Sequence, residues 1–129
     1  MKRYVKYHTV VCEDLDELNH VNNVKYIDWV QSIAKDHWNK KAQKDIIDQY
    51  YWVLIDHHIQ YKKPAFLNDN LKIETFVTGI SGVTSERIVE IHNTDKTQLI
   101  VLSKTTWCLM DRNSHKPKRM SHDIAQIFD

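Results

Sequence analysis

The sequence predicts an α+β fold in which one long helix lies across a curved antiparallel sheet. Apolar residues at Val24, Ile27, Val30 and Ala34 follow helical spacing in the first third of the chain. After about residue 50, strand-forming runs alternate with short turns, which favours antiparallel pairing. A long helix followed by four strand runs is typical of an α+β domain, here with a sheet of about five strands.

The first strand is expected within residues 3–13, where Tyr, Val and Thr mix with charged residues as on a strand with one solvated face. The long helix follows an acidic turn. Asn22 is its predicted N-cap, with Val21 and Tyr26 forming a hydrophobic staple across the helix start. The apolar stripe carries the helix to about Lys40.

The remaining elements are marked by turn residues. Residues 42–50 are expected to form a short second helix or an irregular connection. Four strands are predicted at 51–63, 70–79, 84–92 and 98–111, separated by Pro, Gly, Asn and Asp residues. A final short helix capped by Ser121 is expected to run to Phe128.

Composition indicates a single domain spanning residues 1–129. The chain has 42% hydrophobic and 27% charged residues, which is a globular composition. Its net charge of +1 gives no reason to expect nucleic-acid binding, so any anion site must be built locally. No segment approaches the ~20 apolar residues that a membrane span requires, so no membrane association is expected.

The cysteines and the N-terminus favour a cytoplasmic protein. Cys12 and Cys108 lie in strand-like runs, and they are interpreted as buried, reduced thiols. The first residues lack the apolar core of a signal peptide.

The run from Asp16 to Tyr26, DELNHVNNVKY, carries the most chemical information. It places an acidic residue and a short polar connection directly before the long helix. A helix N-terminus offers unpaired N–H groups and partial positive charge, which stabilise a developing oxyanion. A carboxylate beside such an end is suited to attack on a polarised carbonyl group.

This run resembles the signature of the hotdog-fold acyl-CoA thioesterases of the 4-hydroxybenzoyl-CoA thioesterase type. Residues 59–75 are similar to that family's tyrosine, basic pair, Pro-Ala, then Asp and a strand ending in Thr. Residues 111–120 resemble its last turn, with spaced basic residues. At position 19 the chain has Asn where many relatives have Gly, and Asn tolerates the left-handed conformation.

The resemblance implies a hotdog fold and hydrolysis of acyl-CoA thioesters to a carboxylic acid and coenzyme A. No cofactor is expected, because coenzyme A is part of the substrate. Thioesters of an acyl-carrier protein share the reacting group and stay an alternative. The resemblance also implies a homodimer or homotetramer in which the sheets of two chains join, which would cover an exposed sheet edge.

The resemblance assigns catalysis to Asp16, as nucleophile or general base, and to Asn23 through its backbone N–H. The substrate-binding candidates are His20, Asn22 and Tyr26, and the coenzyme A candidates are Lys116, Lys118, Arg119, Ser81, Thr84 and Ser85.

Each assignment has a structural alternative. On the residues alone, Asp16 only complements the helix dipole, Asn22 is a cap and His20 stabilises a turn. The basic cluster is then a solvated loop, although a diphosphate ligand needs local cations. Glu13 and Asp14 are expected to be solvated charges.

The histidines do not predict a metal site. His57 is expected on the face shared by Ile55, Ile59 and Tyr61, as a core or interface histidine with its hydrogen bonds satisfied. His58 points to the opposite face, so the pair cannot chelate one metal ion.

Two other functions are considered. A hotdog dehydratase would need a histidine base, either His20 or His57. A non-catalytic acyl-CoA binder would need the cradle at the helix end but not Asp16.

Overall fold

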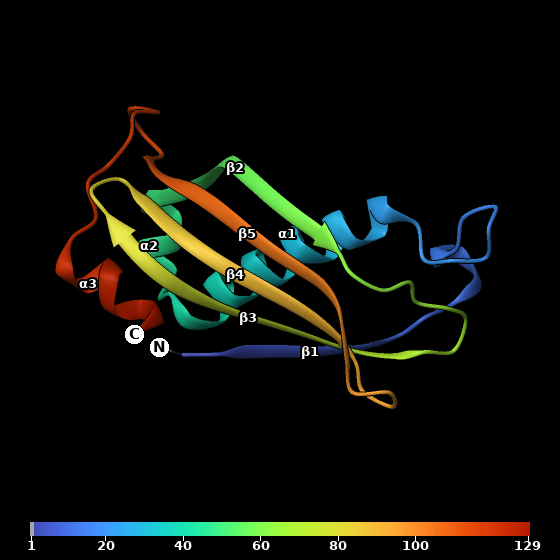
Figure 1. The fold of residues 1–129 in the computed structure, drawn as a ribbon. Helices are drawn as coiled ribbons and strands as arrows, with labels where there is room; N and C mark the ends of the chain where they lie inside the picture. Colours follow the sequence, from blue (N-terminus) through green and yellow to red (C-terminus); the bar gives the residue numbers. More distant parts are fainter. Residues whose placement is uncertain (1) are drawn as a thin grey trace.

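The computed structural model describes residues 2–129 and shows one long helix packed on a five-stranded sheet (Figure 1). Helix α1 spans Asn23–Lys41. All strand pairs are antiparallel, in the order β1-β3-β4-β5-β2, which confirms the predicted α+β architecture. The strands are β1 (Tyr4–Thr9), β2 (Tyr50–Tyr61), β3 (Asn70–Ser81), β4 (Thr84–Asn93) and β5 (Gln98–Asp111).

Helix α1 begins where its cap predicts. The Asn22 side chain accepts a hydrogen bond from the Val24 amide at 3.0 Å, so one of the unpaired amides of the first turn is satisfied. Lys40 and Lys41 lie in the last turn, where positive charge complements the helix dipole. The staple residues Val21 and Tyr26 both belong to the main buried cluster.

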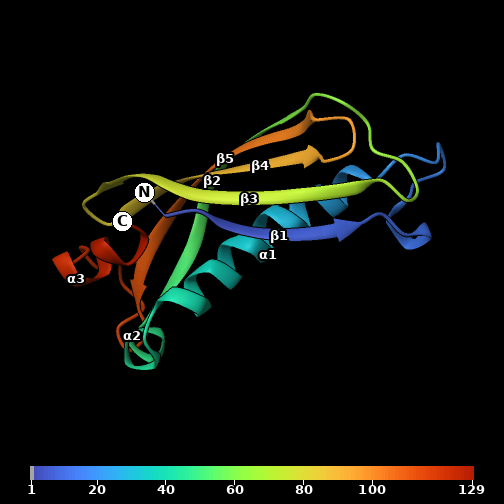
Figure 2. The same ribbon diagram turned by 90° about the horizontal axis from the view of Figure 1, so that it is seen from below.

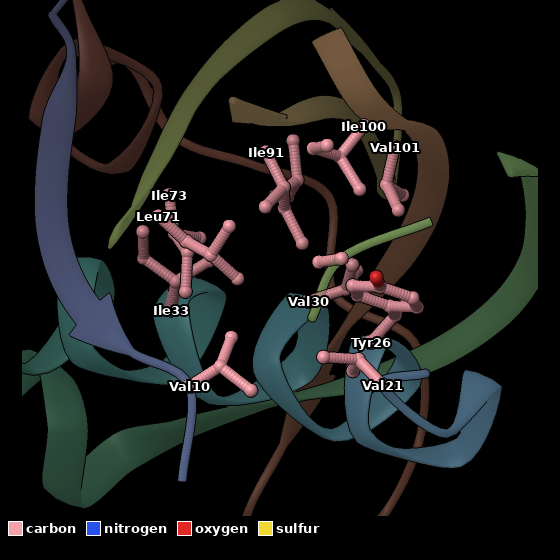
Figure 3. Packing of buried hydrophobic residues seen from close by; sticks show 12 residues of the cluster. Val10, Val21, Tyr26, Val30, Ile33, Leu71, Ile73, Ile91, Ile100 and Val101 are labelled. Atoms are coloured by element: carbon pink, nitrogen blue, oxygen red, sulfur yellow. The ribbon is translucent and has the colours of Figure 1, made fainter. Parts of the chain in front are cut away.

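The main core lies between α1 and the concave face of the sheet (Figures 2 and 3). From the helix, Val30 and Ile33 are at most 1% exposed. Facing side chains from the sheet complete the cluster, chiefly Leu71, Ile73, Val89, Ile91, Ile100 and Val101. Burial of this apolar surface holds the helix against the strands, at roughly 1.5–3 kcal/mol for each large side chain.

Strand β1 is shorter than predicted and ends at Thr9. Residues Cys12–Asp14 form a 3-10 turn instead. The Asp14 carboxylate turns the chain here, because it accepts hydrogen bonds from the Val11 amide at 3.0 Å and from His8 Nε2 at 2.7 Å. Asp14 is therefore only 5% exposed, so the expectation of a solvated charge was wrong for it and held only for Glu13.

The two cysteines are both free thiols, in different environments. Cys108 is buried in β5, as expected. Cys12 is exposed, because the chain has already left the sheet at that point, so its predicted burial was wrong.

Strand β2 contains a bulge that sequence alternation did not indicate. The register with β5 shifts between Leu54 and Asp56. Ile55 is consequently 56% exposed and does not share a face with His57, contrary to the prediction. His57 bonds Ser103 Oγ through Nε2 at 2.9 Å. Within residues 2–129, no three His, Cys, Asp or Glu side chains are grouped so that they could hold a metal ion.

The short helices pack around the end of α1. Helix α2 covers Lys44–Gln49, which decides between the two expectations for that segment. Helix α3 covers His122–Ala125 and continues as a 3-10 turn to Phe128, and Ser121 Oγ accepts the Ile124 amide as predicted. Across the described chain, no helix combines the length and apolar character needed to cross a membrane.

The two ends of the molecule differ in content. The loop that carries Asp16 lies at one end, where α1 begins. The β3–β4 turn, the segment after β5 and both chain termini lie at the other end in both ribbon views (Figures 1 and 2). The residues that were predicted to act on one substrate therefore lie at opposite ends of the molecule.

Candidate active site

The Asp16 loop is held by its own carboxylate. Asp16 Oδ1 accepts hydrogen bonds from the amides of Leu18 at 2.9 Å and His20 at 3.2 Å. The Asp16 amide in turn donates to the His20 carbonyl at 2.8 Å. Asn19 adopts the left-handed conformation (φ 61°) that its residue type allows. The second carboxylate oxygen, Oδ2, accepts no hydrogen bond from any residue in 2–129.

Backbone bonds around the helix start leave one amide free. The Val21 amide donates to Ala65 O and the Asn22 amide to Asp14 O, both at 2.9 Å. The Val24 amide is capped by the Asn22 side chain. The Asn23 N–H is the first of the helix and has no acceptor among the described residues. It is thus available to a ligand at the positive end of the helix dipole.

A pocket of about 380 Å³, the Asp16 pocket, contains these groups in its lining. The loop and the helix start contribute Asp16, His20, Asn22 and Asn23 to its lining. The end of β2 and the residues that follow contribute Tyr61, Lys62, Lys63 and Pro64. The structure therefore brings all the predicted catalytic and substrate-binding residues to one cavity, together with Tyr26.

Sequence reasoning missed the two lysines of this pocket. Lys62 and Lys63 are exposed, while their amides donate to the Ile100 carbonyl at 2.8 and 3.3 Å. Neither forms an ion pair with a described carboxylate. The basic pair before Pro64 was visible in the sequence, but it was interpreted as part of a strand end.

His20 and Tyr26 contribute aromatic rings to the lining of the pocket. The His20 ring packs edge-on against Phe66, with centroids 5.2 Å apart. Tyr26 is 2% exposed, and its hydroxyl is buried without a hydrogen-bond partner in the described chain. Burial raises the pKa of Tyr26 to about 12, so this hydroxyl is a neutral donor at physiological pH.

The coenzyme A candidates gather away from this pocket. The amide of Lys118 donates to Leu109 O, and that of Met120 to Gly82 O at 3.0 Å, so the basic turn lies against the β3–β4 hairpin. Lys116, Lys118 and Arg119 are exposed. Thr84 Oγ1 closes the hairpin on Ser81 O at 3.0 Å. None of these residues lines the Asp16 pocket.

A second, larger cavity of about 540 Å³, the Arg87 cavity, lies beside the later part of α1. It contains Ser85, which is 5% exposed and so faces this cavity rather than the hairpin surface. Polar side chains also line it, among them Lys35 and Arg112. Six aromatic side chains come from α1, β2, β5 and the C-terminal turn: Trp38, Tyr50, Tyr51, Trp52, Trp107 and Phe128. Arg87 of β4 also lines it and is only 4% exposed.

Arg87 contacts a buried histidine. Its Nη1 donates to His37 Nδ1 at 2.9 Å and to Thr75 Oγ1 at 3.0 Å. Since a guanidinium only donates, His37 Nδ1 must be unprotonated and the proton resides on Nε2. Burial, together with the nearby charge of Arg87, lowers the pKa of His37 to about 4. The imidazole is therefore neutral at physiological pH.

This neutral histidine predicts acid sensitivity. In the unfolded chain His37 titrates near pH 6.5, whereas in the fold it resists protonation down to about pH 4. The unfolded state thus binds more protons than the folded state between these pH values. The contribution of His37 to the free energy of unfolding is therefore complete above pH 6.5 and is lost as the pH falls toward 4. The expected loss is about 3 kcal/mol, at roughly 1.4 kcal/mol per pH unit.

Urea unfolding at pH 7.5, 6.5, 5.5 and 4.5 checks this expectation. His37→Asn retains an acceptor for Arg87 but does not titrate, so its stability should fall less steeply than that of the wild type. His122→Asn, at an exposed position, serves as the control and should follow the wild type. Parallel curves for the wild type and His37→Asn would contradict the assignment of a neutral, buried imidazole.

Comparison with known proteins gives a family and a fold. The sequence model of the family described as Acyl-ACP thioesterase N-terminal domain matches residues 1–128. No curated protein matches the chain by sequence.

Several solved structures are similar to this one along nearly the whole chain. A 1,4-dihydroxy-2-naphthoyl-CoA thioesterase from Synechocystis has a TM-score of 0.83 at 15% identity, covering 98% of this chain and 96% of that one. The YbaW Probable Thioesterase from Escherichia coli has a TM-score of 0.87 at 19% identity, covering 95% and 94%. A hypothetical protein from Staphylococcus aureus in complex with CoA has a TM-score of 0.86 at 12% identity, covering 98% and 81%. These likenesses confirm the predicted hotdog fold.

Proposed function

The chain belongs to the acyl-ACP thioesterase family and is a thioester hydrolase, and on that premise we propose that it hydrolyses acyl-CoA thioesters in the Asp16 pocket. The observation that carries the proposal is the pairing of two unsatisfied groups in one cavity. The Oδ2 atom of Asp16 is a free carboxylate oxygen, and the Asn23 N–H is a free donor at a helix N-terminus. One group supplies the attack and the other stabilises the oxyanion.

The reaction has two forms that use the same groups. In the first, an Asp16 oxygen attacks the thioester carbonyl carbon, the C–S bond breaks, and the thiolate leaves and takes up a proton. Water then opens the mixed anhydride and regenerates the carboxylate. In the second, Asp16 takes a proton from water as the water oxygen attacks the carbonyl carbon. The C–S bond of the tetrahedral intermediate then breaks, and the leaving thiolate takes up the proton from Asp16. In both forms the negative charge grows on the carbonyl oxygen, beside the Asn23 N–H.

The thiol carrier of the acyl group is proposed to be coenzyme A. The exposed Lys62 and Lys63 at the pocket place cations where a diphosphate would enter. The solved Staphylococcus aureus structure contains CoA, which supports the same choice. The family description names acyl-ACP, so carrier-protein thioesters are the second substrate class to test.

The basic turn at residues 116–119, which lies far from the Asp16 pocket of its own chain, is consistent with an active site that two subunits share. Strand β2 lies at one edge of the sheet. Pairing of two copies along β2, related by a twofold axis, would place the basic turn of one chain near the Asp16 loop of the other, since these features lie at opposite ends of each chain. We therefore propose a homodimer in the cytoplasm in which Lys116, Lys118 and Arg119 bind coenzyme A phosphates for the partner subunit's pocket.

The alternatives have less support. For a dehydratase, His57 is engaged with Ser103 and does not line the Asp16 pocket, and the ring of His20 packs on Phe66. For a non-catalytic binder, the unbound oxygen of Asp16 would have no role.

A thiol-release assay tests the proposal. The wild-type protein is mixed with aliphatic and aromatic acyl-CoAs and with acyl-carrier proteins of the same acyl groups, and free thiol is followed over time. Turnover of acyl-CoAs above the buffer rate is expected. Turnover of carrier-protein thioesters alone would move the assignment to that class. Tight acyl-CoA binding without thiol release would favour the binder, and loss of enoyl-CoA absorbance without thiol release would favour a dehydratase.

A further inference from the structure

We propose that the Arg87 cavity is a second ligand site, which binds an organic carboxylate with an apolar or aromatic body. The proposal does not depend on the role of Asp16, because the two cavities share no lining residue.

The first argument is an uncompensated buried charge. Arg87 is 4% exposed, yet within residues 2–129 no aspartate or glutamate forms an ion pair with it. Burying a cation without a counter-ion is costly, and buried charges in proteins are normally paired. Burial lowers the pKa of Arg87 to about 10, which still leaves the guanidinium charged at neutral pH. A bound anion would supply the missing partner.

The second argument is the set of donors that remain. Only Nη1 of Arg87 donates to the described residues, namely to His37 and Thr75. The Nε and Nη2 donors form the side edge of the guanidinium, whose fork matches the two oxygens of a carboxylate. The indole Nε1 of Trp52, in the wall of the same cavity, is likewise buried without a partner in the described chain.

The third argument is the character of the walls. Six aromatic side chains and Ile47 line the cavity, and Arg87 lies over the Phe128 ring at 5.0 Å. Its volume of about 540 Å³ is in the range of small-molecule sites. Lys35 and Arg112 also line the cavity but are exposed, so Arg87 is its buried cation. Aromatic side chains around one buried cation favour a ligand that has an apolar body and one anionic end. The ligand could be a free carboxylic acid or an acyl group with a second carboxylate.

Tryptophan fluorescence gives a direct binding assay, because Trp38, Trp52 and Trp107 line the cavity. The probes are 4-phenylbutyrate and its neutral amide, 4-phenylbutyramide. Saturable binding of the acid is expected, with the amide at least tenfold weaker. Arg87→Gln should weaken acid binding at least tenfold and change amide binding less than threefold, since only the acid forms a charged hydrogen bond.

Arg3→Gln is the matched control. Arg3 is exposed, pairs with Glu74 at 2.8 Å and lines neither cavity. Its loss should change acid binding less than threefold, because it lies outside the site and solvent screens its charge. Absence of saturable acid binding, or equal affinities for acid and amide, would overturn the proposal. The comparison of acid with amide on the wild type decides the matter even if Arg87→Gln does not fold.

Turnover distinguishes the two sources of the carboxylate. Octanoyl-CoA is compared with the eight-carbon thioester that carries a terminal carboxylate. A loss of kcat/KM for the second thioester alone in Arg87→Gln would show that the acyl end reaches Arg87. Unchanged ratios together with binding of the free acid would show a separate carboxylate ligand.

Discussion

Asp16→Asn is expected to lower kcat for thioester hydrolysis by about 10²–10⁴-fold while the fold persists. Asparagine retains an oxygen that can accept the amides of Leu18 and His20, so the loop keeps its hydrogen bonds. It lacks the negative charge that either form of the reaction requires. Thiol release from the best acyl-CoA measures the effect, and thermal unfolding checks the fold.

Glu17→Gln is the control for this variant, because Glu17 is exposed and adjacent but does not line the pocket. It removes the same charge from the same loop and should keep activity within threefold. If Asp16→Asn hydrolyses acyl-CoA at the wild-type rate, Asp16 has no part in the chemistry.

Asn23→Pro is expected to lower kcat by about 10²–10³-fold, because it removes the main-chain donor at the helix start. A backbone donor is usually inaccessible to mutation, but Asn23 is the first helical residue, where proline is well accommodated. The preceding residue, Asn22, has φ −65° and ψ 134°, a conformation that proline allows its neighbour. The helix should therefore form as before, which circular dichroism verifies.

The matched variant Asn23→Ala keeps the backbone donor and removes only the side chain. It is expected to stay within threefold of wild-type kcat. Equal rates in the proline and alanine variants would exclude the Asn23 N–H as the oxyanion donor. A loss of activity in both variants would instead assign a role to the Asn23 side chain.

The helix and the four later strands were predictable because their signals are local. Periodic apolar residues and the Asn22 cap fixed the start of α1, and clusters of Pro, Gly, Asn and Asp separated the strands. The end of β1 was not predictable, because it depends on a bond between Asp14 and His8 across a turn. The bulge at Ile55 was equally hidden, since it exists only in the pairing of β2 with β5.

The Asp16 pocket was predicted from resemblance, and the Arg87 cavity was not predicted. Alternation along β4 places Arg87 on the same side as Ser85 and Val89, and all three are buried. That alternation was the available signal. The cavity itself forms between α1, β2 and the C-terminal turn, which no short stretch of sequence brings together.

The hydrogen bonds of Asp16 have a consequence for reaction speed. One oxygen is committed to the loop amides, so the rotation of the side chain is frozen and the other oxygen has a fixed direction. The entropy of orienting the reactive atom is thus lost during folding and not at each encounter with substrate. Preorganisation of this kind makes the conformation of the loop, as much as the carboxylate itself, a determinant of rate.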